Sequence, residues 1–376
     1  MTLKVGIVSA AWGGMAHLPA WRAVPGVEVT AICTSREETA RAAVEQFKVE
    51  RPFWDALEMC ADPDIDIVDL GTRPNWRLPW VLAALEHGKH VYNSSPHAPD
   101  WEGAGAIDAA WKAAGTVGVV DAFVEWVPAI RQQIALIEDG YLGTPFSGTC
   151  HFNISLFNQP MPGFPYNWFA DGEAGVSGMR NNGSHALYPL LKAFGPVEEL
   201  VADDRQLLGE WRFPDGSVTK PDPTDFGSAM LRFASGFVLQ LQASWAMTLH
   251  DGWLLDVFGE KGRLVTTAPT FPTARDCVLR GAQLTGDPRQ AHMPTVLPEL
   301  DIPDEFRTPA GLGMDWQVPM QPSFPMAVSM ERMVAAIQGK GDAEPTFARA
   351  LEVERIQRAI TVSQDERRWV KLAEIG

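Results

Sequence analysis

The stretch LKVGIVSAAWGG, residues 3–14, decides the fold that we predict for this chain. Its first half, residues 3–8, is a short apolar run bounded by small residues, which indicates a buried β-strand. Residues 9–14 form a turn of mostly small residues, and a helix-like segment follows from about Met15 to Val24. This order of strand, small-residue turn and helix predicts the first unit of a doubly wound α/β domain.

Strand-like and helix-like segments alternate along the chain from residue 3 to about residue 122. Such alternation is typical of βαβ units that build a parallel, doubly wound sheet. The pattern then changes to one helix and to longer, partly alternating strands with hairpin-like turns. We therefore expect an α/β protein with a Rossmann domain at residues 1–122 and a second α/β domain at residues 123–376, built on a large open, mostly antiparallel sheet. Residues 269–322, which are rich in Pro and Gly, indicate irregular loops.

Composition and charge restrict the classes of partner. The chain has 376 residues, of which 46% are hydrophobic and 21% charged, as in globular proteins of two domains. The formal charge of −16 argues against binding to nucleic acid, which requires a basic surface. No apolar run reaches the roughly 18 residues of a membrane helix, and the chain begins without the features of a signal peptide, so we expect a cytoplasmic protein with no membrane partner. The four cysteines form no CxxC pair, and no group of residues has metal-ligand spacing, so we expect no metal site.

The turn at residues 9–14 aligns with the dinucleotide fingerprint G-x-G-x-x-G. In that motif the first glycine makes the tight turn, the second lets a pyrophosphate approach the backbone, and the third lets the helix pack on the strand. Only the third glycine keeps its place here, but the residues at the other two positions are small enough for close approach. The candidate cofactor contacts in this turn are Ser9, Ala11, Trp12, Gly13 and Gly14.

The residues after the second strand bear on the choice of cofactor. An Asp or Glu about 20 residues beyond the fingerprint would bind the ribose 2′-hydroxyl of NAD. This chain has Thr34, Ser35 and Arg36 there instead, and an arginine flanked by hydroxyl groups suits the 2′-phosphate of NADP. We therefore expect NADP as the cofactor, with NAD as the second choice. The alternative is that Ser35 only caps the next helix and that Arg36 is a solvated charge.

Further motifs make the chain resemble the Gfo/Idh/MocA family, named after glucose–fructose oxidoreductase, inositol dehydrogenase and a rhizopine-catabolism protein. The resemblance extends over nearly the whole chain and is carried, in order, by VGIV…GGMAHLPAW, DPDIDIVDLGTRPN, ALEHGKHVY, LIEDGYLG, NNGSH, VFGEKGRL and SQDERRWVKL. It implies a Rossmann domain followed by an α/β domain, and oxidation or reduction of sugars, cyclitols and related carbonyls with a nicotinamide cofactor. It also implies a homodimer or homotetramer formed through the open sheet of the second domain.

Two motifs of that family are altered in this chain. The family usually has Glu-Lys-Pro after GKHV, and its lysine assists proton transfer; the positions here are Ser94, Ser95 and Pro96. The family motif Asp-x-Gly-x-His, whose histidine exchanges a proton with the substrate oxygen, begins here with Asn181 and ends with His185. Ser95 and Asn181 have no useful charge. The resemblance therefore leaves His185 as the expected catalytic proton-transfer group, since an unperturbed imidazole titrates at about pH 6.5.

The remaining candidate site residues follow from the same motifs. The family contacts the cofactor with Thr-Pro-x-Asn, which corresponds to Thr72, Pro74 and Asn75. The turn after GKHV adds the cofactor contacts Asn93 and Pro96. The expected substrate contacts are Asn181, Tyr166, Trp168, Arg180, Ser95 and His97. Further polar residues close to these motifs are Tyr92, Arg77, Glu125 and Tyr188.

Three functions remain open from the sequence. The first is an NAD(P)-dependent oxidoreductase acting on a small polyol, cyclic or aromatic substrate in a less charged site than usual, because Ser95 and Asn181 are neutral. Aromatic residues in Pro-rich segments such as FPYNWF suit such a ligand, although tryptophan is more often a core residue. The second is a non-redox sensor or repressor-like protein that binds a dinucleotide or another ligand. The third is a lyase or hydratase that uses His185.

Overall fold

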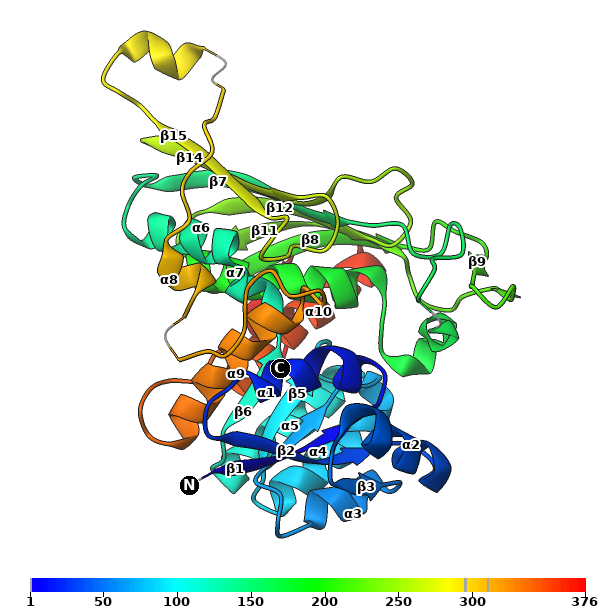
Figure 1. Cartoon of the computed structure of the whole chain (residues 1–376). Coiled ribbons are helices and arrows are strands. Elements are labelled where there is room, and N and C mark those ends of the chain that lie inside the picture. The colour runs from blue at the N-terminus through cyan, green and yellow to red at the C-terminus, as the bar shows by residue number, and fades with distance from the viewer. Residues whose placement is uncertain (1, 165, 294–295, 310) are drawn as a thin grey trace. The chain divides into compact units, whose positions relative to one another are not determined.

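The computed structural model describes residues 2–164, 166–293, 296–309 and 311–376, and the chain divides into two compact units (Figure 1). Unit 1 is formed by Met1–Trp126, Glu173–Gly175 and Thr308–Glu354. Unit 2 is formed by Val127–Gly172, Val176–Arg307 and Arg355–Gly376. The predicted boundary at residue 122 lies near the end of the first segment of unit 1, but a single boundary does not account for the return of the segment Thr308–Glu354 to that unit.

Unit 1 contains a parallel six-stranded sheet with the strand order β3-β2-β1-β4-β5-β6. The bounds of its strands are β1 (Leu3–Val8), β2 (Val27–Cys33), β3 (Arg51–Phe53), β4 (Ile67–Leu70), β5 (His90–Ser94) and β6 (Gly118–Asp121). This is the order of a doubly wound dinucleotide-binding sheet, in which the direction of winding reverses between β1 and β4. The predicted Rossmann domain is thus confirmed.

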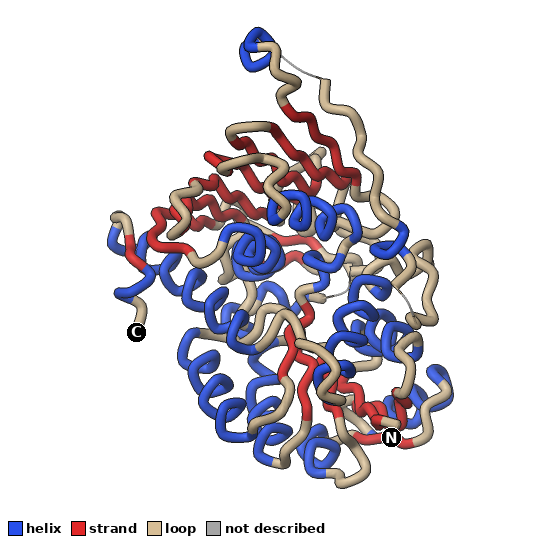
Figure 2. The backbone as a smooth tube through the Cα atoms, turned by 90° about the vertical axis from the view of Figure 1, so that its left-hand side faces the viewer, coloured by secondary structure: helices blue, strands red, loops and turns tan. Residues whose placement is uncertain are grey.

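Helices lie on both sides of this sheet, as Figure 2 shows. Their bounds are α1 (Leu18–Arg22), α2 (Glu37–Phe47), α3 (Ala56–Ala61), α4 (Pro74–Glu86), α5 (Trp101–Ala114) and α9 (Ser323–Ile337). Helix α1 packs with α9, and α4 packs with both α3 and α5. The glycine predicted to stop α4 does so, because Gly88 adopts φ +68° directly after the cap residue His87.

Two π-helical turns occur where the sequence motifs predict ligand binding. The turn η1 (Gly13–His17) connects β1 to α1, where we expected a plain helix from about Met15. The turn η5 (Met179–Gly183) precedes α7 (Ser184–Phe194) in unit 2. π-Helical turns are rare in proteins and are frequent at functional sites, so both deviations from regular helix support the assignment of these motifs.

Unit 2 is built on an eight-stranded sheet with the order β15-β14-β13-β7-β12-β11-β8-β16. Only β7 and β12 pair in parallel among these neighbours; the other pairs are antiparallel, as predicted. The bounds are β7 (Pro145–Asn153), β8 (Val197–Arg205), β11 (Phe226–Phe233), β12 (Val238–Ser244), β13 (Gly252–Gly259), β14 (Gly262–Ala268), β15 (Val278–Gln283) and β16 (Val370–Lys371). A separate two-stranded sheet pairs β9 (Trp211–Arg212) with β10 (Val218–Thr219).

One face of the large sheet is packed by helices. Helix α6 (Pro128–Glu138) contacts β14 and β15, and α7 contacts β7. Along β13, Trp253, Leu255 and Val257 are buried, whereas the alternate residue Phe258 is 43% exposed. Two further α-helices are the short α8 (Asp304–Arg307) and the long α10 (Phe347–Glu366). The strand β15 lies within residues 269–322, which we expected to be irregular throughout.

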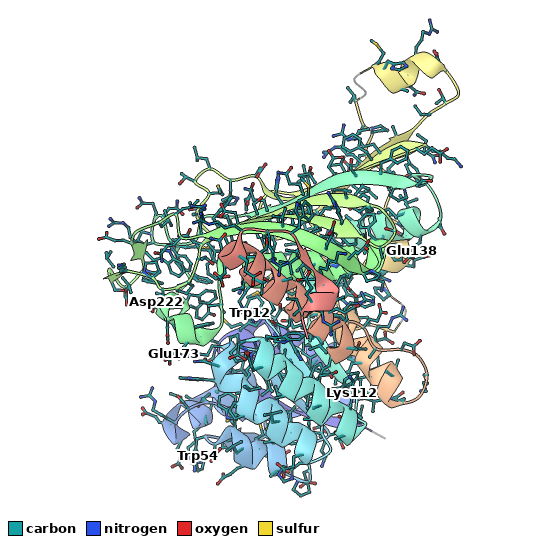
Figure 3. The ribbon with its side chains drawn as sticks, turned by 180° about the vertical axis from the view of Figure 1, so that it is seen from behind. Trp12, Trp54, Lys112, Glu138, Glu173 and Asp222 are labelled. Atoms are coloured by element: carbon teal, nitrogen blue, oxygen red, sulfur yellow. The ribbon has the colours of Figure 1, made fainter. Side chains whose placement is uncertain are left out.

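The tryptophan residues divide between core and surface. Trp21, Trp211, Trp245 and Trp253 are fully buried. Trp54, by contrast, is 44% exposed, and Figure 3 shows it far from Trp12 on unit 1. The core interpretation of tryptophan therefore holds for these four residues and fails for others. None of the helices in the described residues has the length and hydrophobicity needed to cross a bilayer.

Candidate functional site

The turn after β1 keeps the backbone of a dinucleotide-binding turn although its first glycine is replaced. Ser9 adopts φ +103°, in the left-handed region that favours glycine. Its hydroxyl oxygen accepts a hydrogen bond from the Ala11 N–H at 3.2 Å, which closes the turn. A non-glycine residue in such a conformation costs of order 1–3 kcal/mol and persists only where the surrounding structure fixes it. Strain of this kind is concentrated at functional sites, so it supports a functional role for the turn.

Close packing requires the two glycines that remain in the turn. A Cβ atom on Gly13 would lie 2.8 Å from Ile7 Cγ2, and one on Gly14 would lie 2.6 Å from the Phe47 ring. A Cβ atom on Gly71, directly after β4, would lie 2.9 Å from the Gly13 backbone. The β1 turn and the end of β4 therefore meet backbone to backbone. This meeting point is where the order of the sheet reverses, which is the usual ligand position in doubly wound sheets.

The segment after β4 provides a buried polar atom that no other described residue satisfies. Pro74 opens α4, and the guanidinium of Arg73 before it stacks 3.5 Å from the centre of the Trp76 ring. Thr72 is partly buried at the same end of the strand. The side-chain oxygen of Asn75 is buried and has no hydrogen-bond partner among the described residues. Because buried polar atoms are normally paired, Asn75 Oδ1 fits a contact with a ligand that carries a hydrogen-bond donor.

Arg77 holds the turn after β5 from within unit 1. Its side chain is buried, and it donates to Asn93 Oδ1 at 2.6 Å, to the Pro96 carbonyl at 2.5 Å and to the Ser94 carbonyl. Asn93 is also fully buried, and its amide donates to the His97 carbonyl at 2.7 Å. The placement of Asn93 favours a supporting role in the turn over the direct cofactor contact that we expected.

The structure does not support the expected substrate contact of His97 either. The side chain of His97 is only 2% exposed, and its ring lies edge-on to Phe347 with the centroids 4.6 Å apart. Burial, together with the charge of Arg77, lowers the pKa of His97 to about 3, so the ring is neutral. A buried neutral ring that packs on Phe347 stabilises the turn and does not face a substrate. The expectation from the motif was wrong on this point because the position of a residue in a turn does not determine the direction of its side chain.

The two serines that stand in place of Glu-Lys offer hydroxyl groups. Ser94 Oγ and Ser95 Oγ are both buried and have no hydrogen-bond partner among the described residues. A hydroxyl group can donate one hydrogen bond and accept two, so this pair suits neutral polar groups of a ligand. Neither hydroxyl can act as the proton donor that an ammonium group would be at neutral pH. Pro96, which completes the motif, is buried.

The end of β2 presents a cation at the same edge of the sheet. Arg36 is exposed, and no described residue forms an ion pair with its guanidinium. Arg36 is also the N-cap residue of α2 and makes no side-chain capping bond, so the alternative role of Ser35 as the cap is not observed. Thr34 Oγ1 donates to the Arg36 carbonyl at 3.1 Å and lies 2.6 Å from Thr39 Oγ1, which fixes the backbone at this point.

These groups of unit 1 fit an extended, anionic dinucleotide. The strands β2, β1, β4 and β5 are neighbours, so their carboxyl ends share one edge of the sheet. Along that edge lie an exposed arginine, a turn of small residues, and the unpaired atoms Asn75 Oδ1, Ser94 Oγ and Ser95 Oγ. A turn of small residues before a helix lets phosphate groups approach backbone N–H groups.

A buried charged cluster beneath the first turn escaped the sequence analysis. His17, the last residue of η1, is fully buried, with Nδ1 2.7 Å from Asp69 Oδ1 and Nε2 3.1 Å from Asp121 Oδ2. The remaining carboxylate oxygens are satisfied as well: Trp21 Nε1 donates to Asp69 at 2.5 Å, and the Tyr92 hydroxyl donates to Asp121 at 3.3 Å. We refer to these five residues as the His17 cluster.

The His17 cluster contains a charged imidazole. Burial alone disfavours the imidazolium form, but the charges of Asp69 and Asp121 outweigh it and raise the pKa of His17 from 6.5 to about 10. The geometry agrees, because both ring nitrogens face carboxylates and only the imidazolium donates from both. His17 is therefore a buried cation at neutral pH.

In unit 2 the altered histidine motif forms η5 and the start of α7. A Cβ atom on Gly178 would lie 2.8 Å from the Asp225 carbonyl oxygen, and one on Gly183 would lie 2.4 Å from Met179 Sδ. Both glycines are therefore needed for the close packing of this turn. The Asp225 side chain, fully buried, accepts hydrogen bonds from three N–H groups and fixes the neighbouring loop.

Buried amides anchor the same turn. Asn182 donates to the Phe152 carbonyl at 3.3 Å and accepts from Trp245 Nε1 at 3.3 Å. Gln357 donates to the Met179 carbonyl at 3.0 Å and to Ser184 Oγ at 3.1 Å. The sequence analysis did not single out either residue, although Asn182 stands next to the motif position Asn181. These bonds restrict the motions of the backbone that carries the two motif side chains.

His185 is the second residue of α7 and is largely buried. Its ring lies edge-on to Phe271, with the centroids 5.2 Å apart, and Phe271 packs on Phe152 at 4.5 Å. Asn181 is only partly buried, and its backbone N–H donates to the Ser177 carbonyl at 2.8 Å. Within unit 2 the structure thus holds the imidazole on a rigid helix start against an aromatic side chain.

A carboxyl group that no motif indicates lies against η5. A Cβ atom on Gly227 would contact both Met179 Cβ at 2.8 Å and Asp204 Oδ1 at 3.3 Å, so Asp204 of β8 neighbours the turn. Burial raises the pKa of Asp204 to about 6, against the opposing effects of a hydrogen bond with Thr224 and the charge of Arg180. The charge of Arg180, an expected substrate contact, therefore acts on the Asp204 carboxyl group within unit 2.

The expected aromatic contacts Tyr166 and Trp168 extend an aromatic core. Tyr166 directly precedes the short helix η3 (Asn167–Ala170) and Trp168 lies within it, and their ring centroids are 6.3 Å apart. Trp168 packs on Phe169 at 4.2 Å, and Phe169 packs on the buried Trp245 at 5.3 Å. Tyr166 and Trp168 remain only partly buried, so they leave part of each ring for other contacts.

Comparison with known protein families matches both halves of the chain. Residues 3–121 match the family model described as an oxidoreductase family with an NAD-binding Rossmann fold. Residues 130–265 match the GFO/IDH/MocA C-terminal domain.

Among curated proteins, the chain is 32% identical to D-apiose dehydrogenase from Paraburkholderia graminis over 260 residues, which cover 67% of this chain and 64% of that protein. The chain thus spans less than two thirds of this relative's length. It is 25% identical to levoglucosan dehydrogenase from Pseudarthrobacter phenanthrenivorans, with 100% of this chain and 99% of that protein covered.

Solved structures share the fold of the whole chain. A levoglucosan dehydrogenase in complex with NADH superposes with a TM-score of 0.86 at 22% identity, covering 99% of each chain. An NAD binding oxidoreductase from Klebsiella pneumoniae superposes with a TM-score of 0.85 at 23% identity, again covering 99% of each chain.

The strained conformation of Ser9 predicts that glycine is the better residue there. We expect Ser9→Gly to raise the free energy of unfolding by about 1 kcal/mol, because glycine adopts positive φ without a steric penalty. Urea unfolding measures the change. Ser147→Gly, the same substitution in the strand β7, is the control and should lower stability. A Ser9→Gly variant no more stable than the original protein would contradict the assigned strain.

The His17 cluster predicts a stability that falls in alkaline solution. Because the pKa of His17 is raised in the folded state to about 10, its stabilisation is complete below its unfolded value of 6.5 and is lost as the pH rises through about 10. The free energy of unfolding, measured between pH 6.5 and 10, should decline more steeply for the original protein than for His17→Gln. Equal slopes for the two proteins would show that His17 is not charged in the folded state.

Proposed function

The chain belongs to the Gfo/Idh/MocA family of NAD-binding oxidoreductases, and from this membership we propose that it is an NADP-dependent dehydrogenase of a neutral, sugar-like substrate. The observation that carries the proposal is the turn at Ser9, which keeps a glycine-like backbone at the reversal point of the sheet. A bound nicotinamide cofactor would supply the hydride chemistry that oxidises an alcohol or reduces a carbonyl.

In this proposal the residues at the carboxyl edge of the unit 1 sheet contact the cofactor. The backbone of the turn from Ser9 to Gly14, which includes Ala11, Trp12 and Gly13, would hold the pyrophosphate. Thr72, Pro74 and Asn75, at the end of β4, would also contact the cofactor. There Asn75 Oδ1 has no hydrogen-bond donor among the described residues. Ser94, Ser95 and Pro96 would lie at the nicotinamide end. The cofactor supplies the hydride acceptor or donor, and the residues of this chain bind and orient it.

His185 carries the proton transfer in this proposal. When an alcohol is oxidised, the hydride leaves the carbon and the hydroxyl proton passes to the imidazole; in reduction, the imidazolium returns a proton to the carbonyl oxygen. A general acid–base group of this kind typically contributes about 10²–10⁴ in rate. Ser95 and Asn181 cannot replace it, because a hydroxyl and an amide neither give nor take a proton usefully at neutral pH.

The substrate that suits these residues is uncharged. Ser95 stands where the family has a lysine that could bind an anion, and Asn181 stands where the family has a carboxylate that could bind a cation. Hydroxyl and amide groups instead exchange hydrogen bonds with sugar hydroxyl groups, and the partly exposed rings of Tyr166 and Trp168 suit the C–H face of a sugar ring. The names of the similar proteins, D-apiose dehydrogenase and levoglucosan dehydrogenase, point to the same class.

The choice of NADP over NAD rests on the end of β2. The exposed Arg36 can form charge-assisted hydrogen bonds with a 2′-phosphate, and no carboxylate follows β2 at the position that would bind the ribose of NAD. A similar protein, levoglucosan dehydrogenase, forms a complex with NADH, so NAD remains the competing cofactor.

The open face of the large sheet suits a second copy of the chain. Met230 and Phe258, on the face opposite the buried residues of β11 and β13, are 42% and 43% exposed. In the family that the chain belongs to, the open face of this sheet commonly forms the contact between subunits. A homodimer, or a homotetramer built from it, would cover this face.

Removal of the Arg36 guanidinium should separate the two cofactors. We expect Arg36→Ala to weaken NADPH binding by about 10- to 150-fold, the equivalent of the 1.5–3 kcal/mol of hydrogen bonds to a charged group, and to leave NADH binding nearly unchanged. Fluorescence titration of the purified protein with each cofactor measures both. Arg41→Ala, in the same helix, is the control, since Arg41 pairs with Glu37. Equal loss for both cofactors, or binding of neither by the original protein, would refute the assignment.

Replacement of His185 should act on turnover more than on cofactor binding. His185→Asn removes the proton-transfer group, so turnover with D-apiose or levoglucosan should fall by about 10² or more, with a small change in NADPH affinity. His151→Asn is a matched control, because His151 lies in β7 and pairs with Asp251. Unchanged turnover in His185→Asn would exclude the proposed role. Cofactor binding without turnover of any sugar in the original protein would favour the sensor.

A further inference from the structure

The His17 cluster lies directly beneath the turn that would hold the pyrophosphate. His17 closes η1, whose first residue, Gly13, packs against the Gly71 backbone. A Cβ atom on Gly71 would lie 3.5 Å from the His17 ring as well as 2.9 Å from Gly13. The ring of Trp12 also meets the His17 ring edge-on, with the centroids 6.3 Å apart. A shift of the His17 side chain would therefore be transmitted to the turn by direct contact.

The cluster ties η1 to two separate strands of the sheet. Asp69 belongs to β4 and Asp121 ends β6, with β5 between them, and Tyr92 of β5 lies under the His17 ring with the centroids 5.7 Å apart. Each nitrogen of His17 and each carboxylate oxygen has a hydrogen-bond partner within the cluster. A buried ionic group with all its partners is costly to rearrange, because loss of the imidazolium leaves two uncompensated carboxylates and loss of a neutral donor leaves a buried carboxylate oxygen unpaired. The end of η1 is thus fixed relative to the strands.

The strain at Ser9 needs such a fixed point. A serine at φ +103° persists only where the structure around it excludes the relaxed alternatives. The hydrogen bond within the turn, from the Ala11 N–H to Ser9 Oγ, is exposed and therefore weak support. The packing of Gly13, and the hydrogen bonds that clamp His17 to Asp69 and Asp121, hold the C-terminal end of the segment that begins at Ser9.

We propose that His17 is a positioning residue of the cofactor turn: by binding Asp69 and Asp121 at once, it holds the strained backbone at Ser9 in the conformation that a dinucleotide pyrophosphate requires. This inference rests on the proposed dinucleotide-binding function. Its distinguishing consequence is a coupling between His17 and Ser9. Once glycine occupies position 9, the turn adopts its conformation without strain, and the clamp becomes dispensable for binding.

A double-mutant cycle tests this coupling. NADPH dissociation constants are measured by fluorescence at a temperature well below the unfolding of every variant, for the original protein, His17→Gln, Ser9→Gly and the double variant. We expect His17→Gln alone to weaken NADPH binding by about ten-fold, within the usual range of coupling between neighbouring residues, and Ser9→Gly to restore most of that loss. Apart from the gain that Ser9→Gly also brings to the original protein, the thermal stability lost with His17 should not return, because the two carboxylates stay uncompensated.

Two further variants keep the test decisive. Tyr92→Phe removes only the hydroxyl that donates to Asp121. If His17→Gln does not fold, Tyr92→Phe takes its place in the double-mutant cycle, and we expect a smaller effect on NADPH affinity. Lys89→Met is the control for lost stability alone, since Lys89 binds two carbonyls elsewhere in unit 1. It should lower stability and leave NADPH affinity within about two-fold.

The outcomes separate the two proposals. If the original protein binds neither NADPH nor NADH, the proposed function fails and this inference fails with it. If the original protein binds cofactor but the losses from His17→Gln and the gains from Ser9→Gly simply add, His17 has a structural role only and the inference is wrong. Recovery of affinity by Ser9→Gly that is confined to cluster variants supports it.

Discussion

The contact between the β1 turn and the end of β4 is the constraint on which unit 1 depends. Gly13 and Gly71 approach so closely that a Cβ atom on Gly71 would fall 2.9 Å from the Gly13 backbone. That approach fixes where η1 begins, and the bond of His17 to two carboxylates fixes where it ends. Because parallel strands bring their carboxyl ends to one edge, the same constraint sets the position of the turn relative to the groups after β2, β4 and β5.

The sequence predicts the elements whose patterns are local and misses those made by distant partners. The alternation up to about residue 122 predicts the parallel sheet, because each strand is a continuous apolar run between helical segments. The strand β15 escapes prediction, since a short edge strand owes its existence to its pairing with β14. The His17 cluster escapes for the same reason: its partners stand 52 and 104 residues from His17, and a run such as IDIVDLGT shows a buried strand without showing what Asp69 binds.

In the candidate site, the motifs locate the turns correctly but do not fix the directions of their side chains. The alignment of Ser9 with the first glycine of the fingerprint suggests a damaged motif, yet φ +103° shows that the backbone kept the original conformation. After β5, the motif places His97 beside the substrate, whereas Arg77, which arrives from α4, draws the turn inward through Asn93 and the carbonyl groups. A residue on another element thus decides which side chains of the turn face outward, and no local pattern carries that information.

The two losses of charge in the family motifs are best understood together. Ser95 is a residue of unit 1 whose hydroxyl oxygen is buried, and Asn181 is a partly buried residue of unit 2. An ion without a partner costs several kcal/mol at a buried position, and a neutral side chain avoids that cost. In the proposed function, these two neutral residues leave the imidazole of His185 as the group for proton transfer. The His17 cluster obeys the same rule in the opposite direction. There two carboxylates share one imidazolium, and neutral donors satisfy their remaining oxygens, so no ion of the cluster lacks a partner.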